Sequence, residues 1–246
     1  MKKNSLFVLL LIMITISACK KEDEIVSHLV KTITVGSTTS TFTYDSQKRV
    51  TQINVSNNKR YEFAYFNNDS IIRYDYDGAT YLGRIWFLFD ANGRNSTTFK
   101  LYSSGTQLTH DFNSSGEMYY LTLSSSSQTR DSLIHTNKNV TTVVHEVSAA
   151  TETREIITIQ YNDKPNTLNR TSFGMQFLPS FYYSTLNVNS LAYIYNTTNQ
   201  NLAIKEGDNI TYTYEFDSKD RITKRIKRNT ASFIEPIYVE EFTYYE

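Results

Sequence analysis

The sequence predicts an all-β protein, an antiparallel meander of repeated hairpins that forms a large curled sheet or a partly closed barrel. Composition is the first indication, because 19 Tyr and 14 Phe stand against 3 Pro in 246 residues, and aromatic side chains favour a pleated surface. The second is a turn motif that recurs along the chain, preceded by aromatics two residues apart on one sheet face. A sheet of so many strands must curl, split or close.

The turn motif places an arginine four residues after an aspartate that follows an aromatic residue. An Asx side chain in such a turn accepts hydrogen bonds from backbone N–H groups two residues on. The fourth motif position requires positive φ, which Gly93 supplies and which Lys48 and Asp220 must accept. The motif residues of the three nearly identical copies are Asp45 and Arg49, Asp90, Gly93 and Arg94, and Asp217 and Arg221.

Weaker copies keep the aromatic and the Asx residue, at Phe66-Asn67, Phe112-Asn113 and Tyr161-Asn162. The Asx positions 45, 67, 90 and 113 are separated by 22, 23 and 23 residues, which fits two strands and two turns per period. Asp77-Gly78 indicates a further hairpin turn of the primed type. The resulting strands are predicted over 29–36, 39–44, 49–56, 59–66, 70–76, 80–89, 96–101, 106–112, 117–123, 128–134, 139–147, 153–161, 209–216, 221–228 and 237–245.

The alternation breaks over about 164–208, around Pro165 and Pro179. Pro cannot donate to a ladder, and aromatics in this segment follow no clean period. A long irregular segment inside a compact domain is either functional or a plug over an open end. We therefore predict a single all-β domain over residues 29–246 with an irregular insertion at about 164–208.

The N-terminus carries a secretory signal. Lys2 and Lys3 precede an apolar run from Leu6 to Ile14 and the small residues before Cys19, a pattern too short to span a bilayer. Residues 1–18 resemble the signal peptide of bacterial lipoproteins. The resemblance implies that Cys19 becomes the lipidated mature N-terminus and that residues 19–28 form a charged tether.

Removal of residues 1–18 leaves 23 basic against 25 acidic side chains, a net charge of −2. A field this weak does not favour nucleic acid as a partner. Cys19 is the only cysteine, so the predicted domain has no cysteine for an internal disulfide.

The chain also resembles a large, uncharacterised group of Bacteroidetes outer-membrane lipoproteins with Tyr-Asp hairpin repeats, which are similar to those of secreted shell proteins. The resemblance rests on the lipoprotein signal, on the unit from Tyr212 to Ile222 and on the segment from Tyr161 to Asn166. It implies a lipid-anchored β domain at the outer membrane. The run from Lys20 to Glu24 resembles the acidic export signal for display at the cell surface, although a solvated tether has the same composition.

The residues that could support chemistry do not form a recognised pattern. The four histidines, His28, His110, His135 and His145, lack metal-ligand spacing. There is no G-x-S-x-G elbow, and surface strand positions explain Glu152, Glu155, Glu240 and Glu241. The stripe Lys224, Arg225, Lys227 and Arg228 is predicted to be a solvated edge. We expect no enzyme activity, no cofactor and no metal.

Aromatic side chains are the one surplus that could bind a ligand. Sugar rings stack on exposed aromatic faces, and the candidates are Trp86, Phe181, Tyr182 and Tyr183; the alternative is that these rings build the core. The sequence thus predicts a non-enzymatic surface lipoprotein that recognises a glycan or an outer-membrane protein. The alternative function is a periplasm-facing carrier or assembly factor with a hydrophobic cavity under the insertion.

Overall fold

The computed structural model describes residues 29–66, 70–89, 95–101, 106–112, 118–124, 128–148, 153–170, 200–231 and 238–246. The predicted signal peptide, Cys19 and the tether lie outside these residues. In the part of the chain that is described, no helix is long and apolar enough to cross a membrane.

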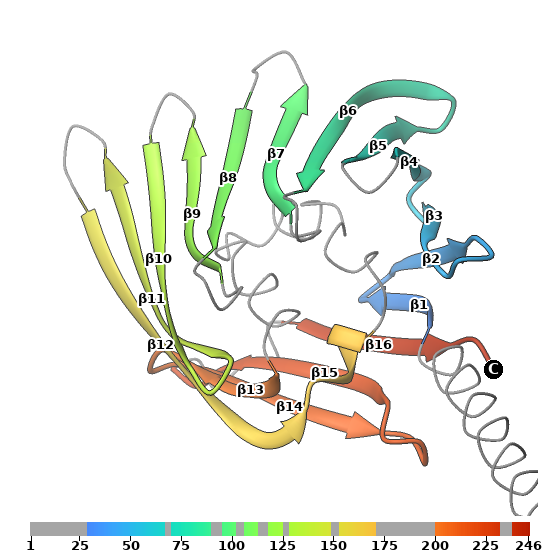
Figure 1. Ribbon diagram of the computed structural model, residues 1–246. Coiled ribbons are helices and arrows are strands. Elements are labelled where there is room, and N and C mark those ends of the chain that lie inside the picture. The colour runs from blue at the N-terminus through green and yellow to red at the C-terminus, as the bar shows by residue number, and fades with distance from the viewer. Residues whose placement is uncertain are drawn as a thin grey trace, which may run out of the picture.

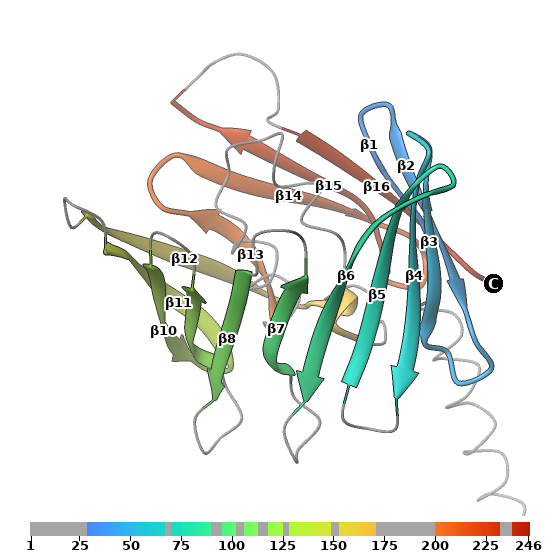
Figure 2. The ribbon, with the colours of Figure 1, turned by 90° about the horizontal axis from the view of Figure 1, so that it is seen from above.

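The described chain consists of antiparallel strands and one short 3-10 helix, η1 (Thr167–Arg170). Each strand pairs with the next, and β16 pairs with β1, so the ring of strands closes into a barrel (Figures 1 and 2). The predicted all-β antiparallel meander is confirmed. The strands are β1 Val30–Val35, β2 Thr38–Tyr44, β3 Val50–Val55, β4 Lys59–Phe66, β5 Ser70–Asp77, β6 Thr80–Phe89, β7 Asn95–Leu101, β8 Thr106–Phe112, β9 Met118–Ser124, β10 Gln128–Thr136, β11 Asn139–Ser148, β12 Thr153–Pro165, β13 Asn201–Glu206, β14 Ile210–Phe216, β15 Ile222–Asn229 and β16 Tyr238–Tyr244.

The predicted insertion is too long at its C-terminal end, because β13 occupies residues 201–206. This strand carries no aromatic-Asx turn, and four of its six residues are of types common in helices, so nothing in its sequence indicated a strand. The ladder between β13 and β14 is short, with Lys205 opposite Thr211 and Glu206 opposite Ile210. Residues 171–199, the centre of the predicted insertion, lie outside the described residues.

The segment at Tyr161 was also predicted wrongly as a chain-reversing turn. The backbone N–H of Lys164 does donate to Asn162 Oδ1 at 3.1 Å, as expected of an Asx residue. The chain nevertheless continues as β12 to Pro165, with register shifts on either side of Tyr161. An Asx hydrogen bond therefore bends this strand and does not end it.

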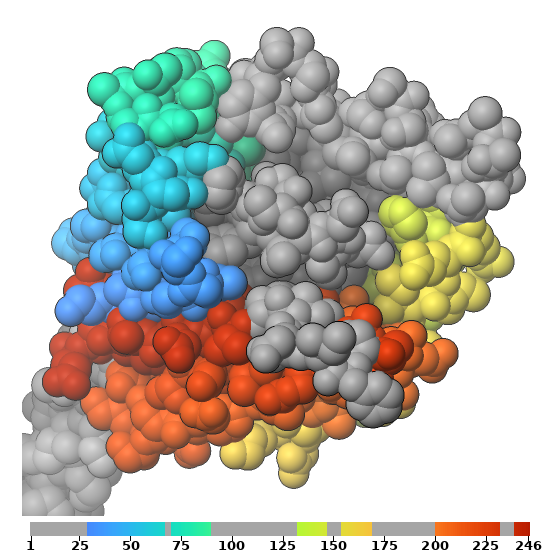
Figure 3. All heavy atoms as spheres, turned by 180° about the vertical axis from the view of Figure 1, so that it is seen from behind, coloured from blue at the N-terminus to red at the C-terminus, as the bar shows by residue number. Residues whose placement is uncertain are grey.

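The described inner face of the barrel holds a large apolar core. Alternate residues of β1 to β6 point inward and are buried, as Phe42 and Ile53 are at 0% exposure; burial of each such side chain contributes about 2 kcal/mol. Figure 3 shows β1 to β6 as a continuous wall that meets the C-terminal strands. The main core cluster comprises Val30, Ile33, Phe42, Val50, Ile53, Val55, Tyr61, Phe63, Ile71, Ile85, Phe87, Leu168, Leu202, Ile222 and Phe242.

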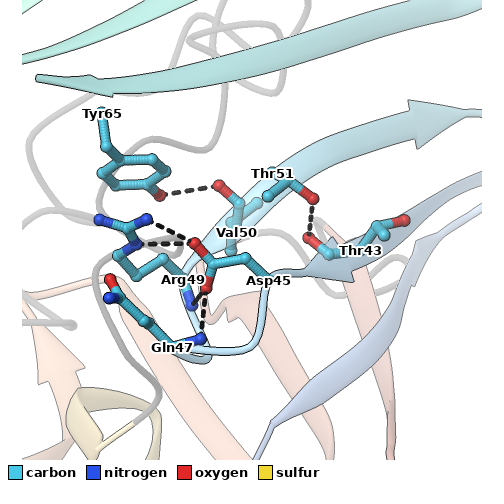
Figure 4. Close-up of polar contacts among 7 residues, drawn as sticks. All are labelled: Thr43, Asp45, Gln47, Arg49, Val50, Thr51 and Tyr65. Carbon is cyan, nitrogen blue, oxygen red and sulfur yellow. Dashed lines mark hydrogen bonds and ion pairs between the residues drawn. The ribbon is translucent and has the colours of Figure 1, made fainter.

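The turn from β2 to β3 is organised by Asp45 (Figure 4). Its Oδ1 accepts hydrogen bonds from the backbone N–H groups of Gln47 and Arg49, both at 2.9 Å. Its Oδ2 accepts one from Arg49 Nε at 2.7 Å. Lys48 has φ +63°, as the motif predicts. Burial alone would raise the pKa of Asp45, but the hydrogen bonds and charge of Arg49 hold that pKa below its usual value.

The turn from β14 to β15 repeats this geometry. Asp217 accepts hydrogen bonds from the backbone N–H groups of Lys219 and Arg221 and from Arg221 Nε, at 2.9, 2.9 and 2.6 Å. Asp220 has φ +57°. In both turns the arginine also lies over a tyrosine ring of the second strand after the turn. Arg49 lies 4.3 Å from the ring centre of Tyr65 on β4, and Arg221 lies 4.6 Å from that of Tyr244 on β16. The third copy, Asp90, Gly93 and Arg94, lies outside the described residues.

Five tyrosines fasten neighbouring strands at the same end of the barrel. Each lies near the end of an even-numbered strand, and its hydroxyl donates to a backbone carbonyl near the start of the preceding strand at 2.7–2.8 Å. We call these bonds tyrosine clasps and this end of the barrel the clasp end. The pairs are Tyr44 with Val30, Tyr65 with Val50, Tyr161 with Val140, Tyr214 with Ala203, and Tyr244 with Ile222.

Candidate binding surface on the outer face of β4 to β6

A buried ion pair points into the barrel from β5. Arg73 Nε and Nη2 lie 2.7 and 2.9 Å from the two carboxylate oxygens of Asp75. The two side chains are only 5% and 4% exposed, and the guanidinium lies 5.1 Å from the ring centre of Tyr61. Such a paired contact satisfies both groups without any ligand.

A second buried group lies on β13 to β16. Arg225 is paired with Glu240, and Lys227 Nζ lies 3.4 Å from Glu206 Oε2. The Tyr212 hydroxyl donates to the same Glu206 carboxylate. Burial lowers the pKa of Lys227, while the charge of Glu206 opposes that change. The two cations and two anions of this group neutralise each other.

The predicted solvated basic edge is therefore wrong for two of its residues. Arg225 and Lys227 are each 1% exposed, because alternate residues of β15 point inward. Glu240, predicted at the surface, is 5% exposed for the same reason. The outward Lys224 is partly exposed, with its Nζ 3.9 Å from Glu241 Oε1. Charge spacing in the sequence cannot distinguish the two faces of a strand.

Aromatic side chains distinguish one part of the outer face. Elsewhere, the described strand residues that point outward are mainly Thr, charged and aliphatic residues, such as Thr32 and Thr243, which share a hydrogen bond of 2.7 Å. On β4 to β6, by contrast, outward positions carry several rings. Among the strand residues whose side chains the structure describes, the outward aromatics are Phe66, Tyr74, Tyr76, Tyr81 and Trp86, on these three strands.

One row of this surface crosses the three strands directly. Arg60 pairs with Tyr76, and Tyr76 pairs with Tyr81. Arg60 lies 4.5 Å from the ring centre of Tyr76, and the rings of Tyr76 and Tyr81 make an edge contact with centres 5.7 Å apart. Tyr81 is 52% exposed, and the neighbouring Leu82 is 49% exposed. This row therefore runs from the Arg60 guanidinium across the Tyr76 ring to the exposed Tyr81 ring.

Glu62 holds this row in place. Its Oε1 lies 3.0 Å from Arg60 Nε. Burial and the charge of Glu62 raise the pKa of Tyr76, whereas Arg60 lowers that pKa. The Glu62 carboxylate thus holds the guanidinium that lies against the Tyr76 ring.

The second half of the surface is formed by Arg84 and Trp86 on β6. The Arg84 guanidinium lies 5.2 Å from the ring centre of Trp86, a cation–π distance. In the part of the chain that is described, no carboxylate lies within ion-pair distance of Arg84. The half-buried Trp86 has a buried indole nitrogen that makes no hydrogen bond to a described residue.

The turn between β5 and β6 holds the exposed rings in a defined position. Gly78 has φ +56° at the first of two turn residues, which fits the predicted primed hairpin. Its N–H donates to the carbonyl of Asn58 in the preceding turn at 2.8 Å. A Cβ at Gly78 would lie 2.8 Å from Asn58 Nδ2. The two turns are therefore packed against each other without room for a side chain.

Of the predicted ligand-binding aromatics, Trp86 lies on this surface, and Phe181, Tyr182 and Tyr183 lie outside the described residues. Sequence reasoning missed Arg60, Tyr76, Tyr81 and Arg84. For Arg60, Tyr76 and Arg84 the available signal is alternation, because these even-numbered positions alternate with residues that face the core. Tyr81 has no such signal, because a register shift between β5 and β6 turns this odd-numbered residue outward. No sequence pattern indicated that these outward positions would combine rings with guanidinium groups.

The described residues contain no group of three His, Cys, Asp or Glu side chains placed to hold a metal ion. His135 and His145 lie on β10 and β11, while the side chains of His28 and His110 are outside the description.

The fold is shared with solved structures, although the sequences are distant. No protein-family model matches the chain, and no curated protein matches it. A porin-like protein from Bacteroides uniformis is 13% identical, with a TM-score of 0.57, and the alignment covers 89% of this chain and 97% of the other. A porin-like protein from Bacteroides vulgatus is 12% identical, with a TM-score of 0.58 and coverages of 88% and 98%.

Proposed function

We propose that this protein is a lipid-anchored, non-enzymatic binding protein of the outer membrane that holds glycan chains on the outer face of β4 to β6. The observation that carries the proposal is the concentration of outward rings on these strands, at Tyr76, Tyr81 and Trp86 in particular. Tyr and Trp combine a large apolar face with a polar edge, which suits a ligand with alternating apolar and hydroxyl surfaces. No comparable set of outward rings occurs among the other strand residues whose side chains the structure describes.

The spacing of the rings favours a chain over a single sugar. Trp86 is paired with Ile72, four residues before Tyr76 on β5. Four residues of a strand span about 14 Å, so a ligand that contacts both Trp86 and Tyr76 must be extended. An oligosaccharide or polysaccharide satisfies this requirement.

The chemistry of the outer face supports a barrel that stands in water. Outer-membrane channel barrels carry an apolar band outside and polar groups inside. Here the described outer face carries ion pairs such as Arg154 with Glu146 and Lys224 with Glu215, while the described inner face packs a large apolar cluster beside buried charges that are paired with each other. We therefore assign membrane attachment to the lipid on Cys19.

The position of the surface supports recognition away from the membrane. The chain enters β1 at Val30, at the clasp end of the barrel. Arg60, Tyr76 and Tyr81 lie near the opposite ends of their strands, about 17 Å from Tyr65 along β4. A lipid tether that begins before Val30 leaves this surface directed away from its anchor.

The alternative of a carrier with an apolar cavity receives no support from the described part of the insertion. Leu168 of η1 and Leu202 of β13 are each 2% exposed and belong to the main core cluster. They fill the clasp end where such a cavity would open. We therefore place the binding site outside the barrel.

Affinity electrophoresis of the purified full chain in gels that contain a polysaccharide tests the proposal. Wild-type protein should be retarded by at least one of a panel of neutral and acidic polysaccharides, and the double variant Tyr81→Ala, Trp86→Ala should lose about tenfold or more in affinity. The matched control is Ile134→Ser, Ile156→Ser, which changes two side chains that are 53% and 59% exposed on β10 and β12. Equal retardation of both variants would overturn the proposal.

Display at the cell surface is tested separately by protease treatment of intact cells. The proposal expects the domain to be cleaved without permeabilisation, while a periplasmic marker stays intact. A domain that is cut only after permeabilisation would place the protein on the inner side of the outer membrane.

A further inference from the structure

We infer that the ligand of the β4 to β6 surface is acidic, a polysaccharide whose carboxylate is bound by Arg84. The inference rests on the proposed function and names the class of ligand that the surface selects. The charges that point outward here are two guanidinium groups, Arg60 and Arg84, against one carboxylate, Glu62. The surface therefore carries a net positive charge, although the mature chain as predicted is slightly negative.

The two guanidinium groups differ in whether a described carboxylate pairs with them. Arg60 is held by Glu62 and stacks on Tyr76. Arg84 stacks on Trp86, and no described carboxylate neutralises it. Glu62, Tyr74 and Arg84 form one row across the sheet, so two strand spacings, about 10 Å, separate the backbones at Glu62 and Arg84.

A guanidinium stacked on an indole keeps its N–H edge free to bind an anion. Arginine presents its donors in a rigid fork that matches a carboxylate, and the ring beneath restricts its rotation. A sugar carboxylate at Arg84 places the adjoining sugar ring over the Trp86 and Tyr76 side of the surface. The surface thereby binds a polymer of acidic sugars in two ways: Arg84 pairs with a carboxylate, and the aromatic rings stack on the sugar rings.

An anionic membrane would also attract arginine and aromatic side chains. The geometry favours the polysaccharide, because the surface runs along the strands from Trp86 to Tyr81, and its Tyr81 end lies opposite the clasp end, where the chain enters at Val30. Vesicles therefore enter the test as a competing ligand.

The probes are polygalacturonate, its fully methyl-esterified form, neutral dextran and vesicles with one third anionic phospholipid. The parent protein is the full chain with Cys19→Ser. The variants Arg84→Gln, Arg84→Lys and the Ile134→Ser, Ile156→Ser control are made in this parent and compared with it. We expect polygalacturonate to bind more tightly than its ester, and Arg84→Gln to weaken polygalacturonate binding about tenfold or more. Arg84→Lys should restore part of the affinity, and binding should fall as salt rises.

The outcomes separate this inference from the proposed function. Equal binding of polygalacturonate and its ester, unaffected by Arg84→Gln but lost in Tyr81→Ala, Trp86→Ala, would overturn the acidic ligand and leave glycan binding intact. Binding to vesicles alone would overturn both. Circular dichroism of each variant confirms that a loss of binding is not a loss of fold.

Discussion

At the scale of single residues, one aspartate organises each of the two described copies of the repeated turn. Asp217 accepts hydrogen bonds from two backbone N–H groups and one guanidinium N–H. Three donors at the chain reversal are thereby satisfied. Asp45 does the same at its own turn. The two copies differ in the exposure of the arginine, since the side chain of Arg221 is 10% exposed and that of Arg49 is 38% exposed.

This difference predicts unequal costs of losing the aspartate. Asp217→Ala should lower the free energy of unfolding by about 2–3 kcal/mol, because it strands donors next to a nearly buried arginine. Asp45→Ala should cost about 1 kcal/mol, because solvent screens its pair. Urea unfolding of both variants measures the two values. Asp217→Asn, which keeps an acceptor, is the control, and an equal cost for both alanine variants would contradict the argument.

The buried ion pairs predict a different pattern. Glu240→Gln leaves Arg225 buried at 1% exposure beside a neutral group, and should cost about 3–5 kcal/mol. The double variant Arg225→Met, Glu240→Leu removes both charges and should recover most of that loss. Thermal unfolding of the two variants gives the comparison. A double variant less stable than Glu240→Gln would show that the pair itself stabilises the barrel.

At the scale of elements, a pair of strands fastened by a tyrosine clasp recurs five times among the described strands. The sequence predicted the hairpins, because aromatics two residues apart and the Asp-to-Arg spacing are local signals. Lys48 and Asp220 were correctly predicted to adopt positive φ. The sequence could not predict β13, whose six residues carry no turn motif. It also could not separate inward from outward charges on β15, because that choice depends on a register shift between Glu215 and Phe216.

The tyrosine clasps predict the response of the barrel to alkali. Burial raises the pKa of Tyr214 to about 12, and burial likewise raises the pKa values of Tyr44, Tyr65, Tyr161 and Tyr244. Unfolded tyrosine ionises near pH 10. The stability that these neutral hydroxyls contribute is therefore complete below about pH 10 and is lost as pH rises toward the folded pKa values.

Phenolate absorbance and circular dichroism, recorded together from pH 8 to 12.5, measure this loss. The clasp tyrosines should ionise together with unfolding, and Tyr214→Phe should lower stability by about 1 kcal/mol at pH 7 while flattening the alkaline decline. Tyr81→Phe, at an exposed ring, is the matched control and should change neither. Ionisation of all tyrosines near pH 10 without unfolding would contradict the prediction.

At the scale of the whole molecule, the two faces of the barrel carry opposite chemistry. The inner face holds an apolar core with mutually neutralised ion pairs, and the described outer face holds Thr, surface ion pairs and one area rich in rings and guanidinium groups. The same alternation of side chains along each strand produces both faces. This arrangement supports our proposal that the barrel stands in water.

The central claim is that lipid on Cys19, and not the wall of the barrel, holds the protein at the membrane. Membranes from cells that express wild type or Cys19→Ser are washed at high salt and alkaline carbonate, and both fractions are probed for the protein. The account predicts that wild type stays with the outer membrane and that Cys19→Ser appears, folded, in the soluble fraction. A Cys19→Ser protein that remains in the washed membrane and needs detergent for release would contradict it.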